Sequence, residues 1–349
     1  TSDAHYKFDD ATQSWVTNEY PPLDELYPER TDSWEAGLSA KFWENRFSLD
    51  VTWYKSNTKK QTMLVPISAS GGYTKQYVQS GDVQNMGMEF ALGFNNTWGD
   101  FSWSSNLTYS FNKNKIIALS PQLEGNYIDQ GGIGTSRIEL HEGGSMGDVY
   151  VTTQLKRDQQ GDILVSNGTL VAEDLKGNNK KVGSVLPDGN IGFRNDFSWK
   201  GINLGFMLSA RLGGVVISGT QAEMDKFGVS KTTADFRDAG GVPVNWERID
   251  TEKFYSVVGG INGIMENYVY SATNVRLQEV SLGYTLPKKW FNEKLSVGLS
   301  LVGRNLWMIY NKAPFDPEAT ASTGTYFQGF DYFCLLYTSD AADDLIGVD

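Results

Sequence analysis

The sequence predicts an all-β protein whose antiparallel strands form part of a transmembrane β-barrel with long extracellular loops. The clearest strand is 101–112, in which Phe101, Trp103 and Leu107 alternate with serine, asparagine and threonine. Successive side chains of a strand point to opposite faces, so this strand has one apolar face and one polar face. A strand of about 11 residues is long for a soluble sheet but crosses a bilayer when tilted. We therefore expect the apolar face to meet lipid and the polar face to meet a water-filled lumen.

Seven further segments share this alternation, and the eight pair along the chain as four hairpins. The hairpins are 31–42 with 46–57, 87–98 with 101–112, 190–200 with 202–212, and 274–286 with 295–306. In the last hairpin Val275 and Leu277 are out of phase with Val280. We therefore expect a β-bulge near Gln278 and Glu279.

The connections between strands alternate between short and long. Those inside the hairpins are a few residues long, whereas those between hairpins span 58–86, 113–189 and 213–273. Long structureless loops are unusual in compact soluble domains, but outer-membrane barrels join their strands by short periplasmic turns and long extracellular loops. Five charges within the predicted strands fall on polar faces: Glu35, Asp50, Arg194, Asp196 and Arg211. This placement supports the barrel, because a charge facing lipid at mid-bilayer costs about 2–4 kcal/mol.

Composition agrees with an outer-membrane barrel and excludes several partners. Aromatic residues make up 13% of the 349 residues, and glycine (37) far outnumbers proline (10). No stretch of 18 apolar residues exists, so no transmembrane helix is predicted. The formal net charge of −12 argues against nucleic acid as a partner and against a polybasic membrane-surface role.

The segment 334–349 departs from the rest in pattern and composition, and we interpret it as a non-native remnant of cloning or assembly. Residues 1–333 are then the native portion that belongs to the barrel. The single cysteine, Cys334, lies in the excluded segment, so no disulfide or thiol chemistry is expected.

Several sequence blocks in order resemble the SusC/RagA-type TonB-dependent outer-membrane transporters. The blocks lie at 26–38, 45–54, 81–89, 196–201, 275–287, 303–306 and 316–318. The resemblance implies a 22-stranded barrel with an N-terminal plug, of which the eight segments here would be strands 14 to 21. It also implies energised import of a large nutrient, commonly an oligosaccharide or glycan and sometimes a peptide. The implied partners are a SusD-like surface lipoprotein, the TonB complex acting through the plug, and outer-membrane lipid.

Chemical motifs offer no support for an enzyme, a cofactor or a metal site. Only two histidines are present, His5 and His141, whereas a zinc site needs three or four suitably spaced ligands. The glycine-rich stretches 131–136 and 143–147 lack the lysine of a phosphate-binding loop. Segment 158–162 resembles part of a calcium loop but lacks the full set of ligands.

Five aromatic residues in or beside the long connections are candidate substrate-binding residues, because flat rings stack on the apolar faces of sugars. They are Trp246, Tyr255, Tyr268, Tyr270 and Trp307. The alternative is that these side chains pack the loops together, contact the lid protein or lie in the interfacial aromatic girdle.

Three other functions stay open at this point. A complete eight-stranded barrel could be a structural or adhesion protein. A soluble β-sandwich or carbohydrate-binding module would need shorter strands with turns every 8–12 residues. An outer-membrane enzyme would need a catalytic site that the sequence does not offer.

Overall fold

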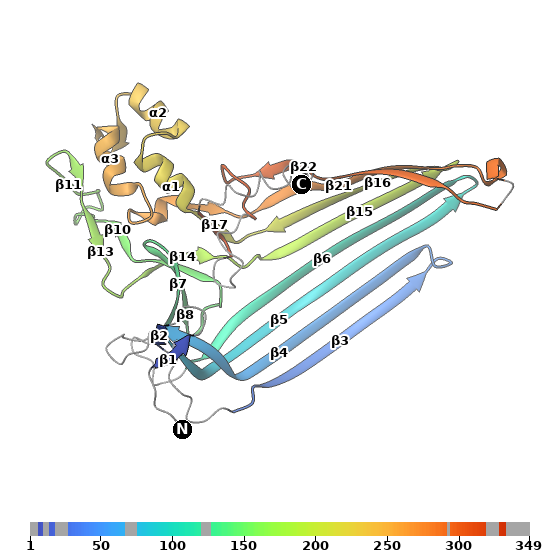
Figure 1. The fold of residues 1–349 in the computed structure, drawn as a ribbon, viewed down its shortest axis with the longest axis horizontal. Helices are drawn as coiled ribbons and strands as arrows, with labels where there is room; N and C mark the ends of the chain where they lie inside the picture. Colours follow the sequence, from blue (N-terminus) through green and yellow to red (C-terminus); the bar gives the residue numbers. More distant parts are fainter. Residues whose placement is uncertain are drawn as a thin grey trace.

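Eight long strands form a single antiparallel sheet, which we call the wall (Figure 1). The computed structural model describes residues 6–9, 14–17, 27–66, 75–119, 127–291, 294–318 and 328–332. The strands of the wall are β3 (Arg30–Phe42), β4 (Phe47–Pro66), β5 (Lys75–Trp98), β6 (Phe101–Ala118), β15 (Gly189–Trp199), β16 (Ile202–Leu212), β21 (Asn274–Thr285) and β22 (Gly298–Asn311). They lie in the order β22-β21-β16-β15-β6-β5-β4-β3, so each strand pairs with its neighbours among the eight in sequence. The predicted strands and their antiparallel arrangement are confirmed.

The register places the predicted apolar residues on one face of the wall, which we call the outward face. One row runs through six strands as Leu49, Leu92, Leu107, Phe193, Leu208 and Leu277, each directly opposite the next. Near the short turns a second row is aromatic, with ring centroids 4.9 Å apart for Phe94 and Trp103 and 6.0 Å apart for Trp103 and Phe197. The expected bulge is present, because Met207 pairs with Glu279 and the next residue pairs with Leu277.

Several strands are longer than predicted or shifted along the chain. β4 continues to Pro66 and β5 begins at Lys75, so most of the expected loop 58–86 is strand. β6 likewise continues to Ala118, and β22 spans Gly298–Asn311 instead of 295–306. Beyond the membrane both faces of a strand can be polar, so the apolar alternation that revealed these strands ends before the strands do.

The two longest connections fold into an ordered unit over one end of the wall, which we call the cap (Figure 1). Its first part holds β7 (Tyr127–Ile133), β8 (Ser136–His141), β9 (Asp148–Val151), β10 (Thr153–Leu155), β11 (Val165–Ser166), β12 (Thr169–Leu170), β13 (Ala172–Asp174) and β14 (Lys180–Ser184). Its second part holds β17 (Val215–Ser218), α1 (Gly219–Lys226), α2 (Lys231–Asp238), β18 (Val242–Val244), β19 (Glu247–Ile249), α3 (Thr251–Val258), the 3-10 helix Met265–Tyr268 and β20 (Val269–Ser271). The later segment β23 (Phe330–Asp331) joins it by pairing in parallel with β17. The expectation of structureless loops is therefore wrong for much of 127–271.

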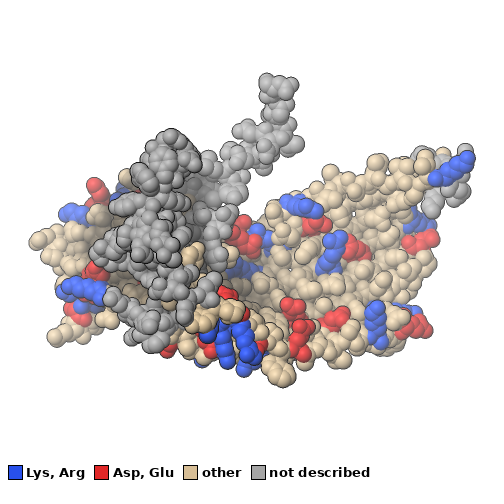
Figure 2. Space-filling view, turned by 60° about the horizontal axis from the view of Figure 1, so that its bottom comes forward, with Lys and Arg blue, Asp and Glu red and all other residues tan. Residues whose placement is uncertain are grey.

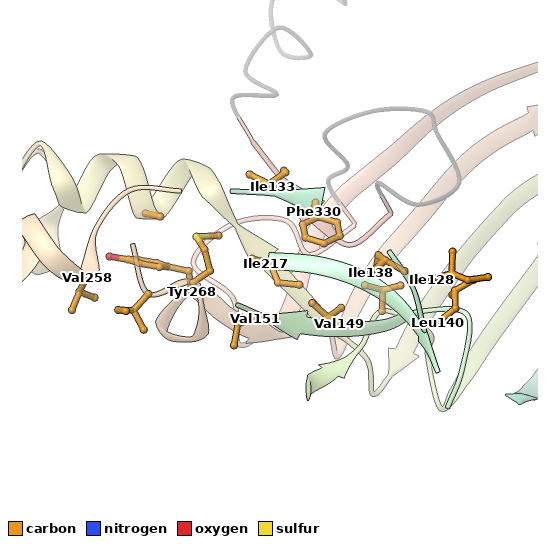
Figure 3. Packing of buried hydrophobic residues seen from close by; sticks show 14 of the residues in the cluster. Ile128, Ile133, Ile138, Leu140, Val149, Val151, Ile217, Val258, Tyr268 and Phe330 are labelled. Atoms are coloured by element: carbon orange, nitrogen blue, oxygen red, sulfur yellow. The ribbon is translucent and has the colours of Figure 1, made fainter. Parts of the chain in front are cut away.

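Most of the buried core of the protein lies in the cap. Figure 3 shows Val149, Ile138, Ile217 and Phe330 gathered between strands of the cap, with Tyr268 toward the helices. Val149, Ile217 and Phe330 have no exposed surface, and they belong to one continuous hydrophobic cluster. The cluster also includes Met63, Val83 and Ile116 from the wall strands β4, β5 and β6. The cap is therefore packed onto the ends of these strands that lie away from the short turns.

The helices α1, α2 and α3 each begin next to a residue whose side chain bonds to the backbone of the first turn. Ser218, Ser230 and Asp250 each accept a hydrogen bond from a backbone N–H in that turn. These bonds satisfy N–H groups that have no partner inside the helix. Among the described residues, no helix is long and apolar enough to span a membrane.

The wall is an open sheet. Within the described strands, β3 and β22 are its edges and do not pair with each other. A hairpin of β1 (Tyr6–Asp9) and β2 (Ser14–Thr17) and the short 3-10 helix Lys288–Phe291 complete the described elements. The segment 334–349 lies outside the described residues, so its non-native origin stays a prediction.

Candidate functional site

The inward face of the wall carries the charges of its membrane-spanning part. The Arg194 guanidinium lies 2.8 Å from a carboxylate oxygen of Asp196 and 3.7 Å from one of Glu279. Glu279 also pairs with Arg304 at 3.1 Å, so ionic contacts link β15, β21 and β22. Figure 2 shows this face, with acidic and basic side chains interspersed over the sheet. These groups stay solvated because the face opposite the lipid is open to water.

Nearer the cap, the inward face carries uncharged amides and hydroxyls that bond to one another. The Tyr54 hydroxyl donates to the Asn112 side-chain oxygen at 3.3 Å, and the Asn112 amide donates to Asn85 at 3.0 Å. Asn114 also donates to Asn85 at 3.0 Å and accepts a bond from the Met146 backbone N–H in the cap at 2.8 Å. This network joins the wall to the cap and presents the kinds of donors and acceptors that bind sugar hydroxyls and peptide amides.

A hollow of about 330 Å³ lies beside the last strand of the wall. Its lining includes Arg276, Asn305, Met308, Asn311, Phe315 and Asp316. The Arg276 side chain is 9% exposed and forms a two-pronged bond with the Asp316 carboxylate, the shorter distance being 2.9 Å. Glu318 lies 3.3 Å from the same guanidinium. Two half-exposed carboxylates thus neutralise a buried cation, and they hold the segment after β22 against the wall.

Three of the predicted aromatic residues come together inside the cap. Tyr255 of α3 and Tyr268 of the 3-10 helix are buried, and Tyr270 of β20 is half-buried. Burial, reinforced by the nearby Asp225 carboxylate, raises the pKa of Tyr255 and of Tyr270 to about 12. The same causes raise the pKa of Tyr268 further. Asp225 itself accepts a hydrogen bond from the Gln221 side chain at 2.8 Å. These tyrosines therefore occupy packing positions around one buried carboxylate.

The two predicted tryptophans lie elsewhere. Trp246 forms the turn between β18 and β19 and is 95% exposed. Trp307 lies within β22, opposite Leu277 on the outward face, and is 64% exposed. Of the five predicted residues, Trp246 alone combines a position in the cap with an open ring surface.

Sequence reasoning did not single out the residues that form the polar network and the hollow. Asn85 and Asn112 lie on different strands, and Arg276 and Asp316 are 40 positions apart. A signal was present for Asp316 and Glu318, because segment 316–318 is one of the blocks that carry the family resemblance.

No group of three or more potential metal ligands occurs among the described residues. In the partial calcium motif, the Asp158 carboxylate instead accepts hydrogen bonds from the backbone N–H groups of Gln160 and Asp162, at 2.9 and 3.0 Å. This carboxylate closes a tight loop between strands.

Comparison with known proteins places the fold in a family. The family described as TonB dependent receptor-like, beta-barrel matches residues 6–306. The TonB-dependent receptor P3 of Formosa agariphila is 28% identical over 85% of this chain and 31% of that protein. The TonB-dependent receptor SusC of Bacteroides thetaiotaomicron is 24% identical over 75% of this chain and 26% of that protein. The chain thus spans between about a quarter and a third of the length of these relatives.

Solved structures show the same fold. The RagAB peptide importer in its closed-closed state matches with a TM-score of 0.66 and 18% identity, over 93% of this chain and 37% of that one. In its open-open state the match has a TM-score of 0.65 and 20% identity, over 94% and 35% of the two chains. The resemblance and the outer-membrane location expected from the sequence are confirmed, as is the expectation of a protein that is not an enzyme. The chain belongs to the TonB-dependent receptor-like β-barrel family.

Proposed function

We propose that the chain forms part of the barrel and the extracellular cap of a receptor that imports a large nutrient across the outer membrane. The observation that carries this proposal is the two-sided wall, apolar outside and hydrated inside, joined at one end to a folded cap. An open, solvated inner face suits passage of a polar solute, whereas a small complete barrel would fill its interior with side chains. The unpaired edges β3 and β22 also disfavour the small structural or adhesion barrel.

The proposed nutrient is a glycan or a peptide. The uncharged network of Tyr54, Asn85 and Asn112 offers hydrogen bonds to either class, and the ionic contacts of Arg194, Glu279 and Arg304 lie deeper along the same face. The similar RagAB protein is a peptide importer, which supports peptides as one of the two classes of nutrient to be tested.

The proposed partners are a SusD-like surface lipoprotein and the TonB complex, acting through a plug that would complete the receptor. The cap offers the lipoprotein a surface, because it exposes large apolar side chains at Phe227 (73%), Val229 (71%) and Trp246 (95%). Clustered apolar side chains mark protein interaction surfaces, and Phe227 and Val229 lie together in the short connection between α1 and α2.

Uptake by bacteria that express the intact receptor tests the proposal. Labelled oligosaccharides and labelled peptides are supplied to the wild type, to a deletion strain and to a strain lacking TonB. We expect one class of nutrient to enter the wild type at least about tenfold faster than either mutant. Equal uptake of both classes by the three strains would refute import by this receptor.

A further inference from the structure

On the outward face of β3 to β6, apolar side chains give way to basic and polar ones over two rows. The last wholly apolar row consists of Ala36, Trp53, Met88 and Phe111, each directly opposite the next. The following row is Trp34, Lys55, Met86 and Lys113, and the row after that is Asp32, Asn57, Gln84 and Lys115. Arg30 and Lys59 face each other one row further on. Basic side chains therefore begin where the apolar band stops.

We call these five basic residues the outer collar: Arg30, Lys55, Lys59, Lys113 and Lys115. They differ from charges deeper in the wall, because Glu35, Asp50, Arg194, Asp196 and Glu279 occupy the inward face. The acidic Asp32 lies beside the collar and pairs with Arg30 at 3.1 Å. The collar thus carries a local positive charge on a chain whose formal net charge is −12. The net charge of the whole chain argued against a basic membrane-surface role, but a sum over all residues does not reveal a local cluster of basic side chains.

The lysines of the collar have no ionic partner among the described residues. Lys59, Lys113 and Lys115 are exposed, and Lys55 is half-buried. Lys55 and Lys113 flank β5, which sets their backbones roughly 10 Å apart, and Lys113 and Lys115 are roughly 7 Å apart along β6. Between them the Gln84 side chain donates to Asn57 at 2.8 Å. Three ammonium groups and two amides therefore lie within reach of one multivalent anion.

The position of the collar identifies the anion. The short turns lie at the opposite end of the wall, so the collar is at the extracellular boundary of the membrane. It faces away from the lumen, which excludes the transported nutrient. Long basic side chains at such a boundary extend toward the headgroups while their stems stay against apolar surface. Clusters of basic residues next to the bilayer attract anionic lipids.

We propose that the outer collar binds the phosphorylated headgroups of lipids in the outer leaflet of the outer membrane. Lys55, Lys113 and Lys115 contact the phosphate oxygens, and the amides of Asn57 and Gln84 donate to neighbouring oxygens. The contact fixes the height of β3 to β6 in the membrane. It is independent of which nutrient the receptor carries.

Lipid binding by the intact receptor in detergent micelles tests the proposal, with native mass spectrometry as the readout. The probe is lipid A, a phosphorylated glycolipid, and the comparison probe is the same lipid after removal of its phosphates. The test variant is the triple K55Q/K113Q/K115Q. The control is K200Q/K289Q/K294Q, which removes the same charge from exposed lysines at the short-turn end.

We expect the wild type and the control to retain lipid A at least about fivefold better than the test variant. Removal of the phosphates should abolish the preference, and millimolar inorganic phosphate should not displace the lipid. The triple K55R/K113R/K115R should bind like the wild type, which separates charge from any effect on folding. Equal binding by the test variant and the wild type, equal binding of dephosphorylated lipid, or displacement by free phosphate would each overturn the proposal.

Discussion

In the wall, Leu38, Leu204 and Leu301 are 60%, 43% and 76% exposed, whereas in the cap Leu140 and Ile128 have no exposed surface. Each strand of the wall other than the edges β3 and β22 pairs on both sides, but no described part of the chain forms a second layer against the apolar face. Its outward side chains become buried only when lipid covers them. The cap contains most of the buried hydrophobic cluster, in short strands and helices that contact one another across long stretches of sequence. The apolar side chains of the wall are thus buried by lipid, whereas those of the cap are buried by other side chains of the same chain.

Because of this difference, we expect the stability of the cap to depend strongly on single residues of its core. Phe330 is fully buried and connects β23 to the cap, so Phe330→Ala should destabilise the cap by about 3–5 kcal/mol. Hydrogen–deuterium exchange of the intact receptor should show faster exchange at the amides of Val149 and Val151. Phe227→Ala, at a position that is 73% exposed, serves as the control. Equal exchange in the two variants would show that the cap has no core of its own.

The wall should be sensitive to polarity on one face only. Leu107 pairs with Leu92 and Phe193 on the outward face, whereas Ser104 lies opposite Asp196 on the inward face. Leu107→Arg should destabilise the membrane-inserted state by about 2–4 kcal/mol, and Ser104→Arg by much less. Urea unfolding of the receptor in lipid vesicles measures both. Similar losses for the two arginine variants would contradict the assigned faces.

Alkaline pH should affect the cap through its buried tyrosines. Their pKa values are raised in the folded state, to about 12 for Tyr255 and Tyr270, so the fold favours the neutral hydroxyl. This stabilisation is complete below the unfolded pKa of about 10 and is lost as the pH rises through about 12. Tyrosinate absorbance and cap hydrogen exchange should therefore change together between those values. Asp225→Asn should lower both tyrosine pKa values, because it removes a nearby negative charge. Unchanged tyrosine titration in that variant would exclude a role for the carboxylate.

The sequence predicted the wall well because lipid imposes a continuous apolar face on every strand. Trp53 is the last apolar outward residue of β4, and the strand beyond Asn57 was not predicted because the apolar alternation had already ended. The cap could not be predicted in the same way. Its strands are short, and Ile217 meets Phe330 only through a pairing between distant segments. Tyr255 and Trp246 were equal candidates in sequence, yet one is buried and the other is 95% exposed. Nothing in local spacing distinguishes an inward loop aromatic from an outward one.

The exposed side of the cap gives the prediction with the smallest effect on stability. Trp246 makes its turn without burying its ring, so Trp246→Ala should change the stability of the cap by no more than about 0.5 kcal/mol. If the cap is the docking surface for the proposed lipoprotein, the same variant should lower co-purification of that partner several-fold. Trp290→Ala is the matched control, since Trp290 is also exposed but lies at the short-turn end. Retention of the partner by both variants would remove Trp246 from the docking surface, whereas loss of the partner in both would indicate a general defect in assembly. A loss confined to Trp246 would show that the cap, unlike the wall, leaves apolar surface exposed to bind a protein.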